Sequence, residues 1–316
     1  MLVVLLLIGR WISPTFFDIN IRDGRLYGNL IDVFNRGAPI AILAVGMVAV
    51  IGTGGIDLSV GAVIAITGAV AAILINAGYP AWQVIVVALV VGLVCGVWNG
   101  ALVAVVGMQP FVATLILMVC GRGIAQMITQ GKIETFVNQD LAAISLGTVF
   151  SIPMPIIISF SVLAVGLFLF RFTSLGMFVE AIGINRRSTN YTGVNTVVIL
   201  FLVYVWAGFC SSVSGLIVAT NILGADANNA GLNSEMDAIL AVVIGGTSLM
   251  GGRFSVVMTF VGALIIQAIN ADILTAGFQP HYNLIIKAVL ILIVLLVQSP
   301  ALKSMKLLRE AKGRKA

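Results

Sequence analysis

The sequence predicts an all-α, polytopic membrane protein with about ten transmembrane helices, some of them short or broken. Three observations lead to this fold class: of the 316 residues 60% are hydrophobic, only 9% are charged, and 34 are glycine. A soluble domain carries roughly 25% charged residues and must keep a polar surface, so water-soluble enzymes and secreted disulfide scaffolds are excluded. The glycine excess is typical of close helix packing and of interrupted helices in lipid.

Hydrophobic runs follow one another along the chain, which predicts one transmembrane domain over residues 1–316 with a basic tail at 301–316. A helix needs about 20 apolar residues to cross a bilayer. The first run is shorter than that, so either upstream residues are missing or its helix continues to about Ser13. The ten runs lie approximately at residues 1–9, 38–52, 58–77, 82–106, 111–129, 152–170, 197–219, 238–250, 254–276 and 284–297.

Basic residues predict the orientation, because cytoplasmic loops carry an excess of Lys and Arg. The tail holds six of them, the gap 171–196 holds Arg171, Arg186 and Arg187, and Arg253 lies two spans from each region. With the C-terminus cytoplasmic, ten of the 17 basic residues lie inside. The net charge of +5 then reflects a tail close to anionic lipid and not nucleic-acid binding.

Two runs, 38–52 and 238–250, are short and are accompanied by glycine clusters. Paired glycine-interrupted segments in the two halves of a transporter indicate broken helices near the translocation path. Non-helical backbone at that depth must be buried in protein or line a cavity. Tight turns between antiparallel helices are the alternative. The predicted path and helix-break residues are Gly54, Gly55, Asp57, Ser59, Gly61, Gly245, Gly246, Gly251 and Gly252.

Three ionisable residues need an explanation within this apolar chain. Asp57 either acts in the transport path or caps the following helix, a role that Ser59 could also take. Arg122 faces a cavity or pairs with an acid such as Asp272. Lys287 lies near a helix start and is expected to snorkel to the interface.

Small residues recur at four-residue spacing in two runs, which predicts helix-packing faces within the subunit. These residues are Gly92, Gly96 and Gly100 in one run, and Ala207, Ser211 and Gly215 in the other. The three cysteines are odd in number and lack a CxxC spacing, so neither a disulfide nor a metal site is expected. The single histidine, His281, is expected at the surface.

Catalytic motifs are missing from the sequence. The position after Gly251 is Gly252 and not the lysine of a phosphate-binding loop, and neither HExxH nor GxSxG occurs. No catalytic residue is therefore expected, and the energy source is expected in a partner. The gap 171–196 is the candidate partner contact because loops of this length usually carry structure or function, although a solvated loop is the alternative.

Several segments resemble those of a known transporter family. The segments GGIDLSVG (54–61), EAIGIN (180–185) and 237–252 resemble ribose-type sugar ABC importer permeases. Two others, QPFVATLILM (109–118) and GADANNAGLN (224–233), are similar to galactofuranose importer permeases.

This resemblance implies a type II-like permease subunit of the bacterial inner membrane, which imports a monosaccharide such as galactofuranose. It also implies three partners: a second permease subunit in a homo- or heterodimer, a periplasmic sugar-binding protein, and an ATPase that binds ATP and magnesium. This chain itself would hold no cofactor. An ion-coupled secondary sugar transporter or facilitator, motivated by Asp57 and Asp272, is the alternative function, and a membrane enzyme is a distant third.

The resemblance further implies two contact regions. The ATPase-coupling loop would contain Glu180, Ala181, Gly183, Asn185, Arg186 and Arg187. On the outer face, the binding protein would dock on Asp226, Asn228, Asn229 and Glu235. For Ser234 to Asp237, a capping box that opens the next helix is the competing interpretation.

Overall fold

The computed structural model describes residues 2–12, 16–18, 20–22 and 24–277, with the single positions 285, 286, 288 and 289. The predictions for His281, Lys287 and the tail 301–316 lie outside these residues, as does most of the run 284–297. The helices are α1 (Leu2–Ile12), α2 (Asn29–Gly52), α3 (Val60–Asn76), α4 (Ala81–Gly100), its continuation η1 (Ala101–Val105), α5 (Pro110–Ile128), α6 (Gln139–Leu146), α7 (Met154–Arg171), α8 (Leu175–Tyr191), α9 (Thr196–Asn221), α10 (Ser234–Ile244) and α11 (Val256–Thr275).

Three small antiparallel strand pairs accompany the helices. The strands β1 (Asn20–Arg22) and β2 (Arg25–Tyr27) form a hairpin, and so do β4 (Thr148–Val149) and β5 (Ile152–Pro153). The third pair joins distant parts of the chain, because β3 (Glu134–Thr135) pairs with β6 (Gly224–Ala225).

Nine of the ten predicted runs each coincide with one helix of the described chain, counting α4 and η1 together. Six of these helices are long and apolar enough to cross a membrane: Asn29–Gly52, Ala81–Val105, Pro110–Ile128, Met154–Arg171, Thr196–Asn221 and Val256–Thr275. Helix α3 is apolar but shorter. A mostly helical chain with several membrane-spanning helices is thus confirmed, whereas the number ten is not.

The expectation of a short helix at 38–52 is wrong. Helix α2 begins at Asn29 and contains 24 residues, or about 36 Å. Its first turns include Asp32, Arg36 and Pro39, which lower the hydropathy of a segment that is nevertheless helical. The other short run is confirmed, since α10 has only 11 residues, or about 16 Å.

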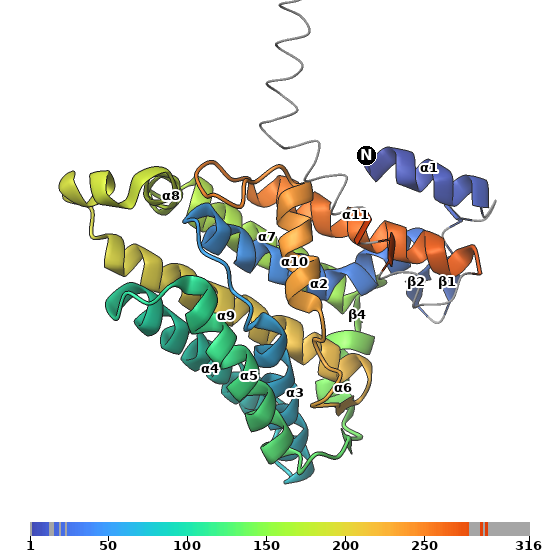
Figure 1. Ribbon diagram of the computed structural model, residues 1–316. Helices are drawn as coiled ribbons and strands as arrows, with labels where there is room; N and C mark the ends of the chain where they lie inside the picture. The colour runs from blue at the N-terminus through green and yellow to red at the C-terminus, as the bar shows by residue number, and fades with distance from the viewer. Residues whose placement is uncertain are drawn as a thin grey trace, which may run out of the picture.

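Helix α9 lies at the centre of the bundle, between α4 on one side and α2 on the other (Figure 1). The predicted glycine face of α4 meets it directly. A Cβ atom on Gly92 would lie 2.3 Å from the Cβ of Ser212, and one on Gly96 would lie 2.6 Å from the carbonyl oxygen of Tyr204. The prediction that these glycines pack within the subunit is therefore confirmed.

The bundle has two ends, which we name after their short helices. At the α8 end lie α8, the C-termini of α2 and α7 and the segment 245–255 (Figure 1). At the α6 end lie α6, the small strand pairs and the N-terminus of α2, where Leu26 donates its amide to the carbonyl of Ser151 (2.9 Å).

Candidate functional site

Two of the non-helical stretches in the described chain hold predicted site residues. The first break, residues 53–59, joins α2 to α3, and the second break, residues 222–233, joins α9 to α10. The sequence located the first break and the glycine segment 245–252, which is non-helical in the structure and connects α10 to α11. It did not identify 222–233, at the other end of α10, as a helix break.

A buried aspartate shapes the first break. The Oδ1 atom of Asp57 accepts hydrogen bonds from the amide (2.8 Å) and the hydroxyl (2.6 Å) of Ser59. Asn99 of α4 donates to the Ser59 hydroxyl oxygen (2.8 Å), so the turn is tied to the bundle. Asp57 is only 3% exposed. It thus supports the start of α3, whereas the Ser59 side chain makes no capping bond.

The end of α2 and the first break meet α8 and the segment 245–255 at five glycines, which we call the glycine junction (Gly52, Gly54, Gly183, Gly251 and Gly252). The amide of Gly252 donates to the carbonyl of Gly52 (2.9 Å). A Cβ atom on Gly183 would lie 2.0 Å from that same oxygen and 2.3 Å from the nitrogen of Gly252. A Cβ on Gly251 would lie 2.7 Å from the nitrogen of Gly54. The fold therefore brings together glycines that the sequence placed in three separate predicted segments.

The other predicted break glycines lie outside this junction. Gly55 faces the hydroxyl of Tyr204, at 2.8 Å from a built Cβ. Gly245 packs against the backbone of α11, Gly246 meets nothing within 4 Å, and Gly61 contacts the second break. The predicted path glycines therefore do not form one cluster.

Helix α8 presents an exposed surface at its own end of the bundle. It is kinked at Asn185, whose backbone is extended (φ −159°, ψ 99°) and whose Oδ1 accepts the amide of Ser188 (3.0 Å). Among the predicted coupling residues, Glu180, Ala181 and Gly183 are half-buried. The exposed ones are Asn185, Arg186 and Arg187, which lie on the same helix as the exposed apolar side chains Met177, Ile184 and Tyr191.

Side chains of α5 organise the second break. Arg122 donates through Nη1 to the carbonyls of Ala227 (3.0 Å) and Ala230 (2.6 Å). Gln126 donates to the side-chain oxygen of Asn228 (2.7 Å). The prediction that Arg122 pairs with Asp272 is wrong. The carboxylate of Asp272 lies beside Gly9 instead, where a Cβ atom on the glycine would be 2.7 Å from Oδ1. The arginine binds main-chain carbonyls instead, which have no signature in the sequence.

Asp226 closes a turn within the second break. Its Oδ1 accepts the amides of Asn228 (3.0 Å) and Asn229 (3.1 Å), and its Oδ2 accepts the side-chain amide of Asn229 (2.8 Å). The hydrogen bond from the Asn229 side chain, together with these amides and the charge of Arg122, lowers the pKa of the Asp226 carboxyl below its ordinary value. The turn is therefore built around an ionised carboxylate.

The predicted docking residues divide into two groups. Asn228 and Asn229 are exposed, and Asp226 is half-exposed beside them. Glu235 instead turns toward α3, since a Cβ on Gly61 would lie 2.7 Å from its Oε2. The predicted capping box at Ser234 is wrong: the helix is capped by Asn233 in a left-handed conformation (φ 63°), and no side chain makes the capping bond.

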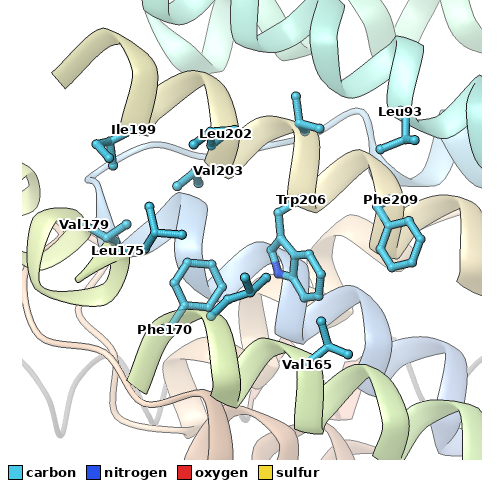
Figure 2. Close-up of a pocket in the computed structure, with 12 residues that line it drawn as sticks. Leu93, Val165, Phe170, Leu175, Val179, Ile199, Leu202, Val203, Trp206 and Phe209 are labelled. Carbon is cyan, nitrogen blue, oxygen red and sulfur yellow. The ribbon is translucent and has the colours of Figure 1, made fainter. Parts of the chain in front are cut away.

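An apolar pocket of about 370 Å³ lies between α4, α7, α8 and α9. Figure 2 shows the rings of Trp206, Phe170 and Phe209 around it. Its one side-chain polar atom, the indole nitrogen of Trp206, already donates to the carbonyl of Val45 (3.2 Å). The pocket therefore offers no free side-chain hydrogen-bonding group to a sugar.

Comparisons with known proteins agree with this architecture. A family described as the permease component of branched-chain amino acid transport systems matches residues 29–295. The chain is 54% identical to the galactofuranose transporter permease YtfT of Escherichia coli (strain K12), which covers 94% of this chain and 87% of that protein. It is 41% identical to the fructose import permease FruF of Bifidobacterium longum, covering 90% of this chain and 82% of that protein.

The ribose import permease RbsC of Haemophilus influenzae is 39% identical, covering 94% of this chain and 91% of that protein. No solved structure matches the chain significantly. Both the family match and the coverage of these relatives extend over most of the chain. The chain belongs to this family of ABC importer permeases, and it is a multi-pass transport subunit and not an enzyme.

Proposed function

We propose that this chain is the membrane-spanning subunit of a bacterial importer that carries a monosaccharide, with galactofuranose or a related sugar favoured. The names of its relatives support a sugar substrate, and the highest identity quoted above is to a galactofuranose permease. The single observation that carries the mechanism is the glycine junction. It brings the backbone of the exposed helix α8 into close contact with the end of α2 and with the segment that packs on the first break, so we expect a movement of α8 to move the break.

The α8 surface is the proposed contact with the ATPase. Its exposed cations Arg186 and Arg187 and its exposed apolar side chains suit a protein partner with an acidic, apolar cleft. In this proposal ATP and magnesium bind to the ATPase and this chain holds no cofactor. The α8 end and the C-terminus are cytoplasmic, and α8 acts as a lever on the bundle.

The α6 end is the proposed periplasmic face. The exposed side chains of Asn228 and Asn229, with Asp226 beside them, are available for hydrogen bonds to a sugar-binding protein. A second permease subunit, identical or related, completes the path, and the run 284–297 supplies the tenth span in the inner membrane. The two breaks and their glycines open one side and close the other during transport.

The first experiment is assembly and uptake. We expect an ATPase and a sugar-binding protein to co-purify with the chain from native membranes. Uptake of galactofuranose should require that ATPase. Uptake in a strain without the ATPase would contradict the proposal. Transport by the purified chain alone in liposomes with an ion gradient would establish the ion-coupled carrier instead.

A charge reversal tests the role of α8. We expect Glu180→Lys to lower uptake at least tenfold while ATP hydrolysis continues, because the half-buried carboxylate lies at the proposed ATPase contact. The matched control is Asp18→Lys, an exposed acid far from α8 along the chain, which should leave uptake unchanged. Unchanged uptake in the Glu180 variant would remove α8 from the ATPase contact.

A further inference from the structure

Helix α5 forms hydrogen bonds to both breaks. Near its start, the Thr114 hydroxyl oxygen accepts the amide of Leu58 in the first break (3.2 Å). Two turns later, Arg122 binds the carbonyls of Ala227 and Ala230 in the second break. The two residues are eight positions apart, or about 12 Å along the helix. One rigid element therefore touches both interruptions of the bundle.

The contacts of Arg122 explain why a cation is kept in an apolar helix. Placing a guanidinium in the bilayer costs free energy unless it has hydrogen-bond or charge partners there. Here it satisfies two carbonyls that the turns of the second break leave without helical partners. Gln126, one turn further along α5, adds a third attachment through Asn228. Asp226 and Glu235 also interact electrostatically with Arg122, which keeps the cation at the break.

The second break also packs directly on the start of α3, the helix that follows the first break. A Cβ atom on Gly61, at the start of α3, would lie only 2.4 Å from the carbonyl oxygen of Gly231. On the other side of α3, a Cβ on Gly121 of α5 would lie 3.1 Å from both Ala62 and Ile66. The start of α3, the helix α5 and the second break are thus packed into one unit without room to slide.

We propose that Thr114 and Arg122 are positioning residues of the transport cycle, through which α5 carries the movement of the first break to the second. The first break follows α8 through the glycine junction, and the second bears the exposed docking residues Asn228 and Asn229. The direction from ATPase to binding protein rests on the proposed function; the coupling itself does not. Because coupling between sites is reciprocal, loss of either α5 contact, at Thr114 or at Arg122, is expected to loosen both breaks.

Hydrogen exchange of the purified full-length chain tests the coupling without any partner. We expect Arg122→Gln and Thr114→Val each to raise exchange at least fivefold in both 54–60 and 226–233. Thr114→Ser keeps the hydroxyl and Arg122→Lys keeps a donor, so both should stay close to the unmodified chain. Met127→Ala, an exposed position on the same helix, is the matched control. Variants that each loosen only the adjacent break, or a control that loosens both, would overturn the proposal.

A second measurement follows the coupling in the assembled transporter. The readout is the ratio of ATP hydrolysis with and without the sugar-loaded binding protein, in liposomes. We expect this ratio to fall at least fivefold in Thr114→Val and Arg122→Gln and to return in Thr114→Ser. An unchanged ratio in both variants would overturn the role of α5 in transport. If the unmodified transporter neither responds to the binding protein nor takes up sugar, the proposed function fails, while the exchange experiment still decides the coupling.

Discussion

The two breaks use the same local turn in different surroundings. In each, an aspartate Oδ1 accepts the amide two residues further on: Asp57 from Ser59 (2.8 Å) and Asp226 from Asn228 (3.0 Å). Asp57 is buried among α3, α4 and α5, whereas Asp226 lies at the edge of the α6 end. The same turn is thus sealed inside the bundle in the first break and open to solvent in the second.

The surroundings decide how each break is held. The first break is held by buried side chains, Asn99 and Thr114, and by the glycine junction, where a methyl group on Gly183 or Gly251 has no space. The second break packs on α3 at Gly231, but its exposed part is held by long side chains, Arg122 and Gln126, that reach it from α5. Close-packed interiors transmit displacement, whereas side-chain contacts at a surface can loosen singly. We infer that the exposed turn of the second break, at Asp226 to Asn229, adjusts more readily than the glycine junction.

The largest expected effect comes from filling the glycine junction. Gly183→Ala would place a Cβ 2.0 Å from the carbonyl oxygen of Gly52, and because both neighbours are backbone the helix α8 must move away. Overpacking of this kind costs about 3 kcal/mol. We expect a lower unfolding midpoint in detergent and loss of uptake.

The matched control for this change is Gly123→Ala on α5, because a Cβ at Gly123 meets nothing within 4 Å. It should unfold at or slightly above the temperature of the unmodified chain, because alanine favours the helix over glycine. A Gly183 variant with an unchanged midpoint and full uptake would show that the junction is loose, and the contrast between the breaks would then disappear.

The second effect compares the two aspartates. Asp57→Ala leaves the buried amide and hydroxyl of Ser59 without their acceptor, which costs about 1–3 kcal/mol. In Asp226→Ala the amides of Asn228 and Asn229 lose the same kind of acceptor but can bind water instead, so this change should cost only about 0.5–1 kcal/mol. Asp57→Asn keeps an acceptor oxygen and should fall between. Unfolding midpoints of the three variants give the order, and equal midpoints for both alanine variants would mean that burial does not distinguish the breaks.

The sequence shows much of the fold because apolar runs report helices directly. The runs identified nine helices, and the glycines around Gly54 identified the first break. The start of α2 was missed because Asp32, Asn35 and Arg36 interrupt the hydropathy of a continuous helix. A hydropathy profile depends only on the residue types in a segment, so it does not detect a polar helical turn that packing stabilises.

The site was less predictable because its contacts are made by backbone. Glycines 52, 183 and 252 are adjacent only in the folded chain, and no spacing in the sequence links them. Arg122 was noticed as a costly cation, but its partners are the carbonyls of Ala227 and Ala230, which any residue could supply. Residue type therefore indicated that Arg122 needs a partner and could not say which.

The smallest expected effect is a pH dependence confined to the second break. Hydrogen bonds from Asn229 and nearby amides, with the charge of Arg122, hold the pKa of Asp226 below the ordinary value of 3.8. The turn is thus stabilised above that pH, and the stabilisation is lost as the pH falls through the lower value of the folded state. Because the group is open to solvent, we expect only about 0.5 kcal/mol, or about twofold in the rate of opening.

Pepsin cleavage within 222–233 measures this opening, because pepsin works across the relevant range of pH. The rate is taken relative to Asp226→Asn, which cannot ionise and corrects for the pH dependence of the protease itself. The relative rate should rise about twofold below pH 4, while the glycine junction, which is made of amides and carbonyls that do not titrate, stays closed. Cleavage beside Ile56 or Leu58 in step with 222–233 would mean that the local Asp226 turn is coupled to the first break as firmly as the α5 contacts of Thr114 and Arg122 are.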